Sequence, residues 1–138
     1  MKIKFTIVDG AYAPERAYPS DAGADLKTME RFVIHDHDRV IIDTGVSAAI
    51  PDGYFGWVAP KSGLASKGIV VNGGIIDSQY RGHINVIMEN LTGETIIFTK
   101  GMKIAQLIII PCECCDFEQV ESLDDTDRGN NGFGSTGA

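Results

Sequence analysis

Hydrophobic and polar residues alternate along most of this chain in short segments that end in turn residues. The first of them, Lys2-Ile3-Lys4-Phe5-Thr6-Ile7, places polar side chains on one side and apolar ones on the other, as a strand covered on one face does. Turn sequences such as Pro51-Asp52-Gly53 and Leu91-Thr92-Gly93 separate such segments. The pattern predicts strands over residues 2–8, 31–35, 39–44, 46–50, 54–59, 84–89, 94–98 and 104–110.

Helical periodicity is nearly absent, so we expect an all-β fold, a sandwich or barrel with one short helix. That helix is predicted around Ser62 to Lys67, with the Ser62 hydroxyl as its N-cap. The strand containing Leu107-Ile108-Ile109-Ile110 is apolar on both faces, and we expect another subunit to cover the second face. A single β-domain over residues 1–127 and a flexible C-terminal arm over residues 128–138, rich in glycine, complete the predicted organisation.

Charge and apolar content exclude several classes of protein. The chain has 138 residues, with 12 Lys and Arg against 19 Asp and Glu, a formal net charge of −7. This balance argues against a broad surface that binds nucleic acid directly. No apolar run is long enough to span a bilayer or to form a secretion signal, so we expect no membrane association and a cytoplasmic location. Three crowded cysteines, Cys112, Cys114 and Cys115, match no disulfide framework or common zinc spacing and indicate reduced thiols.

Two glycine-containing segments carry polar groups that a β-sandwich does not need. Asp25, in Ala22-Gly23-Ala24-Asp25-Leu26, is expected in a loop after the first strand, as a solvated turn residue or as part of a site. Pro60-Lys61-Ser62-Gly63 precedes the short helix, where exposed N–H groups can bind phosphate or the serine can simply cap the helix.

Two further segments contain a candidate base and a polar interruption of a strand. Asp77, next to Ile76 and close to Tyr80, is expected to be oriented and partly desolvated, as a general base must be; a plain turn residue is the alternative. Gln106 interrupts an apolar strand and would be costly to bury without a ligand or a neighbouring strand.

The C-terminal sequence Gly132-Phe133-Gly134-Ser135-Thr136-Gly137 is the most unusual feature of the chain. Its glycines allow the backbone to approach a ligand, and Phe133 could stack on a base. Arg128, Ser135 and Thr136 could hold phosphates. No P-loop, dinucleotide-binding glycine motif or His-Glu-x-x-His metal motif occurs, so the tail is interpreted as a nucleotide lid.

These four segments and the tail, in this order and spacing, resemble the five motifs of the trimeric dUTPases from about Ala22 to Gly137. The resemblance implies a jelly-roll-like distorted β-barrel and a homotrimer whose sites are built from several subunits. It also implies Mg²⁺-dependent hydrolysis of dUTP to dUMP and pyrophosphate by attack of water on the α-phosphate. That reaction limits uracil in DNA and supplies dUMP for thymidylate synthesis.

Roles follow from the resemblance residue by residue. Asp77 would activate the attacking water, Tyr80 would pack on the deoxyribose, and Asp25 would touch the water shell of a Mg²⁺ ion held by the phosphates. Arg128 would bind the γ-phosphate and Phe133 would cover the uracil. The implied substrate-binding residues are Lys61, Ser62, Gly63, Asn72, Gly74, Ile76, Tyr80, Gln106, Arg128, Phe133, Gly134, Ser135 and Thr136.

The chain departs from the family pattern at Lys61, Met102, Lys103 and Asn131, where Arg, Asp, Arg and Gly are usual. Lysine in place of arginine loses a planar bidentate donor, which can change phosphate geometry or a supporting ion pair. A dCTP deaminase, which shares the fold, is disfavoured because residues 73–82 contain no glutamate. A regulatory protein that senses nucleotides and binds an unidentified protein partner remains an alternative.

Overall fold

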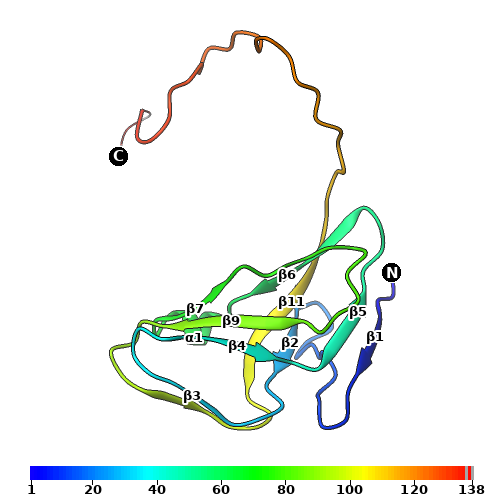
Figure 1. Ribbon diagram of the computed structural model, residues 1–138, viewed down its shortest axis with the longest axis vertical. Helices are drawn as coiled ribbons and strands as arrows, with labels where there is room; N and C mark the ends of the chain where they lie inside the picture. The colour runs from blue at the N-terminus through cyan, green and yellow to red at the C-terminus, as the bar shows by residue number, and fades with distance from the viewer. Residues whose placement is uncertain (136, 138) are drawn as a thin grey trace.

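The computed structural model describes residues 1–135 and 137, and its secondary structure is antiparallel strand apart from one short helix (Figure 1). This arrangement confirms the predicted all-β class. The elements are β1 (Lys4–Ile7), β2 (Gly23–Lys27), β3 (Phe32–Ile34), β4 (Arg39–Asp43), β5 (Val46–Ala49), β6 (Tyr54–Ala59), α1 (Ser62–Ala65), β7 (Ile69–Asn72), β8 (Ile75–Ile76), β9 (Asn85–Asn90), β10 (Ile96–Phe98) and β11 (Lys103–Pro111).

Strand β11 is the centre of the largest sheet, whose order is β2-β11-β6-β8. Gln106 on β11 lies opposite Asp25 on one side and Ala59 on the other, so residues far apart in sequence meet in one row. A second sheet has the order β4-β9-β7, and the pairs β1-β5 and β10-β3 complete the domain. The predicted strands are all present, although most are a residue or more shorter or shifted at their ends.

Three strands were not expected from the sequence pattern. Residues 23–27 form β2, so the expectation that Asp25 lies in a loop is wrong. Glycine, alanine and aspartate disfavour strands by propensity, yet pairing with β11 and burial of Leu26 override that preference. Strands β7 and β8 are short and separated by Gly73 and Gly74, both at positive φ.

Helix α1 is a single turn that begins without a side-chain cap. The N-cap position is Lys61, in an extended conformation, and Ser62 is already helical. The prediction that Ser62 caps the helix is therefore wrong. The helix begins at Ser62, one residue earlier than a Ser62 cap would require. Ser62 and Gly63 are both exposed, which leaves the start of the helix open to solvent.

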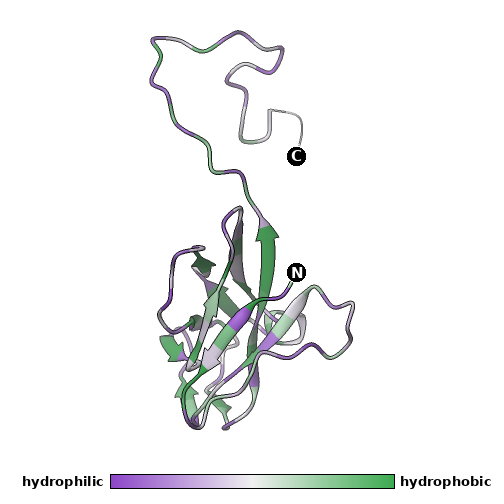
Figure 2. Ribbon diagram, turned by 90° about the vertical axis from the view of Figure 1, so that its right-hand side faces the viewer, coloured by the Kyte–Doolittle hydropathy of each residue, from purple (hydrophilic) through white to green (hydrophobic). Residues whose placement is uncertain are grey.

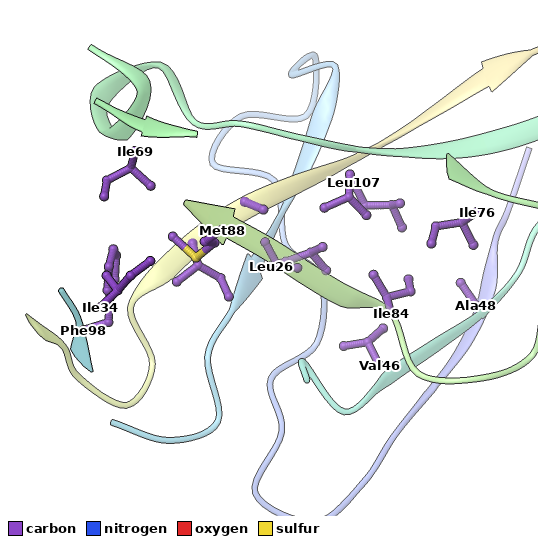
Figure 3. Close-up of a cluster of buried hydrophobic side chains, with 14 of the residues drawn as sticks. Leu26, Ile34, Val46, Ala48, Ile69, Ile76, Ile84, Met88, Phe98 and Leu107 are labelled. Atoms are coloured by element: carbon purple, nitrogen blue, oxygen red, sulfur yellow. The ribbon is translucent and has the colours of Figure 1, made fainter. Parts of the chain in front are cut away.

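A continuous apolar core lies between the sheets (Figure 3). Leu26 and Leu107 from the β11 sheet face Met88 and Val86 from the β9 sheet, and none of these side chains is more than 5% exposed. Phe32 and Phe98 stack with ring centroids 4.7 Å apart and extend the core along the β10-β3 pair. Phe98 is fully buried and Phe32 is partly buried, although the residues of β3 and β10 are all apolar and do not alternate.

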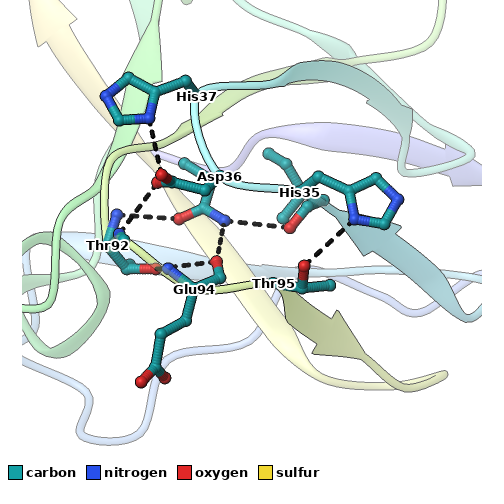
Figure 4. Close-up of polar contacts among 9 residues, drawn as sticks. His35, Asp36, His37, Thr92, Glu94 and Thr95 are labelled. Atoms are coloured by element: carbon teal, nitrogen blue, oxygen red, sulfur yellow. Dashed lines mark hydrogen bonds and ion pairs between the residues drawn. The ribbon is translucent and has the colours of Figure 1, made fainter.

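Two turns, one containing Asp36 and His37 and the other Thr92 and Glu94, lie side by side (Figure 4), and Asn90 forms hydrogen bonds that connect them. Its Nδ2 donates to the carbonyl oxygens of Ile34 and Glu94, at 3.0 and 2.7 Å, and its Oδ1 accepts from the Thr92 N–H at 3.0 Å. The Asn90 carbonyl accepts from the backbone N–H of His37, a residue at positive φ. Because Asn90 is fully buried, this network satisfies a polar side chain that would otherwise be costly inside the core.

The chain leaves the domain after β11 (Figure 1). Strand β11 is coloured as hydrophobic over most of its length in Figure 2. Ile108 and Ile110, on its outer face, are only half-buried, so this face is incompletely covered in a single chain. The Cys112 N–H donates to the Gly53 carbonyl at 2.9 Å, and beyond it the described residues form no helix or strand. Within residues 1–135 and 137, no helix has the length and apolarity needed to cross a membrane.

Candidate active site

A pocket of about 360 Å³ lies beside the β7-β8 hairpin. Asp77 and Tyr80, the candidate base and the candidate sugar-packing residue, both contribute to its wall. The full lining is Ile41, Gly74, Ile75, Ile76, Asp77, Tyr80, His83, Asn85 and Ile87. The pocket is therefore apolar for much of its surface, with a few polar groups at its margin, as is usual for sites that bind small molecules.

Gly74 brings the hairpin into close contact with β6. Its φ is +91°, and a Cβ atom there would lie 2.7 Å from the Val58 carbonyl oxygen. The Val58 N–H donates to the Gly74 carbonyl at 2.8 Å. Only glycine meets both requirements, so the wall of the pocket depends on this residue.

Asp77 is more exposed than the sequence indicated. Ile76 is buried, but Ile75 is 60% exposed and Asp77 itself is exposed. The partial desolvation expected of Asp77 is therefore not found in the single chain. The reason is that β8 is a two-residue strand at the sheet edge, paired with β6 alone, so alternate side chains point outward.

Tyr80 is fixed at both its backbone and its hydroxyl. Its N–H donates to the Asp77 carbonyl at 3.1 Å, and its hydroxyl donates to the His83 carbonyl at 2.9 Å. A side chain at Gly82 would collide with that hydroxyl. Arg81 locks the same turn, since its Nη1 donates to the carbonyls of Ser78 and Tyr80 at 2.6 and 2.8 Å. The Tyr80 ring is thus held in one orientation at the pocket.

A second cluster forms around Asp25, which is 5% exposed. Lys61 pairs with its Oδ1, and the Lys103 Nζ lies 2.6 Å from its Oδ2. Burial opposes ionisation of this carboxyl, but hydrogen bonds and charge from Lys103 and Lys61 outweigh it, and the pKa of Asp25 lies below its ordinary value. The Asp25 carboxylate in turn raises the pKa of Lys103. The cluster holds two cations around one anion.

Gln106 joins the Asp25 cluster to the segment before α1. Its Nε2 donates to the Pro60 carbonyl at 2.9 Å. Across the strand pair, a side chain at Gly23 would collide with the Gln106 side chain. The neighbouring strands that Gln106 needed are therefore present, and the first, second and fourth candidate segments meet at one place.

The remaining predicted site residues lie elsewhere in the single chain. Asn72 is not part of the pocket wall; its Nδ2 donates to Glu89 Oε2 at 3.1 Å. Arg128 donates through Nε to the Asn131 carbonyl within the C-terminal segment. Phe133, Gly134 and Ser135 are fully exposed there. Thr136 lies outside the described residues.

The sequence patterns did not single out His83 and Asp43. The His83 Nδ1 lies 2.9 Å from Asp43 Oδ2, and His83 contributes to the pocket wall. Burial opposes ionisation of Asp43, but hydrogen bonds from His83 and the Gly45 N–H outweigh it and lower the pKa of this carboxyl. A signal for His83 existed, because it directly follows the Tyr80-Arg81-Gly82 turn; Asp43, forty residues away, gave none.

Comparisons with known proteins agree on one family. The family model described as dUTPase matches residues 9–137. The deoxyuridine 5′-triphosphate nucleotidohydrolase of Cutibacterium acnes is 47% identical over 128 residues, which cover 90% of this chain and 84% of that protein. A solved structure of a mutant Staphylococcus bacteriophage 80alpha dUTPase with dUpNHpp matches with a TM-score of 0.90 and 29% identity, covering 99% of both chains.

A further solved structure concerns the metal. A mutant dUTPase from phage phi11 of S. aureus matches with a TM-score of 0.81 and 28% identity, covering 88% of this chain and 98% of that one. It is described as revealing the coordination of a structural Mg(II) ion.

Proposed function

The chain belongs to the dUTPase family, and we propose that its pocket at the β7-β8 hairpin and its Asp25 cluster hold the base and the phosphates of dUTP. It hydrolyses dUTP to dUMP and pyrophosphate. The observation that carries the site assignment is the pocket wall, in which a carboxylate and a fixed tyrosine ring lie side by side on a rigid hairpin. These are the groups needed to activate water and to orient a sugar.

Asp77 is the proposed base. In the part of the chain that the structure describes, no hydrogen bond donor occupies its carboxylate, so both oxygens can accept a proton from water. The proton would pass from water to the Asp77 carboxylate as the water oxygen attacks the α-phosphorus. Backbone groups between Gly74 and Tyr80, together with Ile76 in the wall, would read the uracil edge and exclude a 5-methyl group.

The triphosphate would lie against the Asp25 cluster. Lys61 and Lys103 exceed Asp25 by one positive charge, and Ser62 and Gly63 are exposed beside them. Lysine ammonium groups, a hydroxyl and open backbone N–H groups suit phosphate oxygens. Gln106 donates to the Pro60 carbonyl and so connects β11 to the segment that carries Lys61 and Ser62.

The residues present fit a Mg²⁺ ion that is carried by the phosphates. Magnesium prefers six oxygen ligands and usually keeps several waters. Both Asp25 oxygens are already paired with lysines, and the described residues contain no group of three or more His, Cys, Asp or Glu suited to a metal ion. Asp25 would therefore touch water around the ion rather than bind it directly. Bound Mg²⁺ neutralises phosphate charge.

A homotrimer would unite parts that lie apart in one chain. No residue of the pocket wall belongs to the Asp25 cluster, and the C-terminal segment extends away from both (Figure 1). The half-buried face of β11 offers apolar surface for neighbouring copies. We propose that residues 128–138 act as a mobile arm, with Arg128 on the γ-phosphate, Phe133 on the uracil, and Gly134, Ser135 and Thr136 on phosphate oxygens.

The three free cysteines support a reducing compartment for this enzyme. Cys112 is half-buried, and Cys114 and Cys115 are exposed, with no disulfide among them. Exposed thiols persist in the cytoplasm, where they are kept reduced. We therefore infer a cytoplasmic location.

Pyrophosphate release from dUTP, dTTP, dCTP and UTP, measured in parallel with Mg²⁺, tests the proposed function. We expect fast release from dUTP alone, because the hairpin and Tyr80 reject an exocyclic amine, a 5-methyl group and a 2′-hydroxyl. Comparable rates with UTP or dTTP would contradict the assigned pocket. Ammonia release from dCTP would instead identify deaminase chemistry.

A further inference from the structure

The His83 side chain joins the pocket to the turn between β4 and β5. Its Nδ1 lies 2.9 Å from Asp43 Oδ2, and the other oxygen of that carboxylate accepts the Gly45 N–H at 2.7 Å. Asp43 is therefore held on both oxygens. A carboxylate fixed in this way can define the orientation of the imidazole ring that bonds to it.

The His83 backbone is an anchor for the pocket wall. Its carbonyl oxygen accepts the Tyr80 hydroxyl at 2.9 Å and the Asn85 Nδ2 at 3.2 Å. Tyr80, His83 and Asn85 all belong to the wall. The position of one peptide carbonyl thus determines where the Tyr80 hydroxyl lies.

The two sides of His83 differ in how firmly the chain is held. On the C-terminal side, the Ile84 carbonyl accepts the Thr44 hydroxyl at 2.7 Å, and the Ile84 N–H donates to Val46 at 2.7 Å. Both Ile84 and Thr44 are fully buried. On the N-terminal side stands Gly82, whose backbone is intrinsically permissive. The bond to Asp43 therefore adds a side-chain restraint on His83, next to the one residue of this turn whose backbone is intrinsically permissive.

We propose that His83, held by Asp43, is a positioning residue that sets the place of the Tyr80 ring and thereby the preference for deoxyribose over ribose. This inference rests on the proposed function, in which Tyr80 packs on the sugar. A 2′-hydroxyl is rejected by contact with the ring, so a small displacement of the ring opens room for it. The effect falls on UTP more than on dUTP, because dUTP has no group at that position.

The test measures kcat/KM for dUTP and UTP in the full-length protein and compares their ratio. For His83→Ala we expect the ratio to fall about tenfold, mainly through a lower KM for UTP. His83→Asn should restore much of the ratio, because its amide can donate to Asp43. His35→Ala is the matched control, since His35 is exposed and bonds Thr95 outside the pocket.

A second variant tests the same contact by changing Asp43, the hydrogen-bond partner, instead of His83. Asp43→Ser keeps a hydroxyl acceptor for the Gly45 N–H and loses the contact with His83, so it should lower the ratio as His83→Ala does. Thermal unfolding and sedimentation of each variant identify any loss of fold. If Asp43→Ser is folded and keeps the wild-type ratio, the proposal is overturned even where His83→Ala does not fold.

A double-mutant cycle with Tyr80→Phe separates positioning from a general effect on the pocket. Tyr80→Phe removes the bond to the His83 carbonyl, so adding His83→Ala should change the ratio little further. Full additivity of the two changes would overturn the proposal. Failure of the proposed function looks different: Tyr80→Leu would leave the ratio unchanged, or the wild-type protein would not prefer dUTP.

Discussion

Lys103 places its Nζ atom 2.6 Å from the buried Oδ2 of Asp25, and Lys61 occupies the other oxygen of the same carboxylate. Both lysines stand where the resemblance to the trimeric dUTPases leads us to expect arginine. Lys61 and Lys103 contact the same carboxylate, so the two departures affect a single ion-pair cluster. Each Nζ serves one carboxylate oxygen, an arrangement that needs no bidentate fork.

Asp25→Asn should destabilise the protein by about 1–3 kcal/mol at neutral pH, because the variant removes the negative charge between two lysines and replaces one of its two acceptor oxygens with an NH₂ donor. The depressed pKa of Asp25 makes this contribution pH-dependent. It is fully present well above the unfolded-state value near 3.8 and is lost as the pH falls through the lower folded-state pKa. Urea unfolding of both proteins between pH 7 and acid, at one protein concentration, checks this. A difference that is independent of pH would contradict it.

Asp77→Asn should keep the fold and nucleotide binding and lower turnover by roughly 10²-fold or more, the usual scale for loss of a general base. Steady-state pyrophosphate release and binding of a non-hydrolysable dUTP analogue measure the two properties separately. Asp9→Asn, an exposed aspartate near the N-terminus, is the control. Turnover within a few-fold of wild type would show that another group activates the water.

Asn90→Ala should cost about 2–4 kcal/mol, since it removes three hydrogen bonds of a fully buried side chain, to the Ile34 and Glu94 carbonyls and from the Thr92 N–H. Chemical denaturation measures the loss. Asn130→Ala, on the exposed C-terminal segment, should change stability by less than about 0.5 kcal/mol. A loss at Asn90 as small as at Asn130 would mean that water replaces the amide.

The protein should sediment as a trimer of about three times 14.9 kDa, because a single chain leaves the outer face of β11 half-covered. Replacing Ile108 with Lys should shift the population toward monomer and lower activity in parallel, because Ile108 lies on the outer face of β11 opposite the exposed Trp57. Analytical ultracentrifugation over a concentration series reads out the state. A fully active monomer would contradict both the assembly and the shared site.

Deletion of residues 129–138 should lower turnover much more than initial nucleotide binding, while the trimer and its unfolding midpoint remain unchanged. Hydrogen bonds of the described residues after Thr126 stay within the segment itself, so the domain loses none of its own contacts. Proteolysis with and without a non-hydrolysable analogue and Mg²⁺ follows the arm directly. Equal cleavage rates together with full activity would leave the segment as a disordered appendage.

Alternation and turn residues were enough to predict most of the strands, because each strand buries one face. They could not predict β2, whose residues disfavour strands and pair only because β11 lies beside them. Ile69-Val70-Val71-Asn72 did carry a strand signal between glycines, but its four residues are too few to stand out. The first, second and fourth candidate segments could be located from sequence, whereas the contact of Lys61 and Lys103 with Asp25 joins positions 36 and 78 residues apart, which no local pattern encodes.

The same limit explains the two errors of orientation. Ser62 has the right chemistry for an N-cap, yet the extended Lys61 takes that position because its side chain reaches Asp25. Asp77 follows two isoleucines in sequence, yet the sheet edge turns Ile75 outward. Both the position of the helix start and the exposure of Asp77 depend on tertiary contacts, which local sequence preferences do not encode.

The hydrogen bond from the Cys112 N–H to the Gly53 carbonyl fixes the end of β11 to the domain. The residues that follow Cys112 therefore act as a tether for the C-terminal motif. From Cys112 to Phe133 the chain spans 21 residues, which reach roughly 70 Å when fully extended and about 25 Å on average as a flexible coil. Acidic residues between Glu113 and Asp127 repel one another and favour the longer end of this range. A ligand on a tether of this length has an effective concentration on the order of millimolar at nearby pockets. In the proposed arm, Phe133 would therefore need only millimolar intrinsic affinity to close over a base half of the time, and it would be released again once the product leaves.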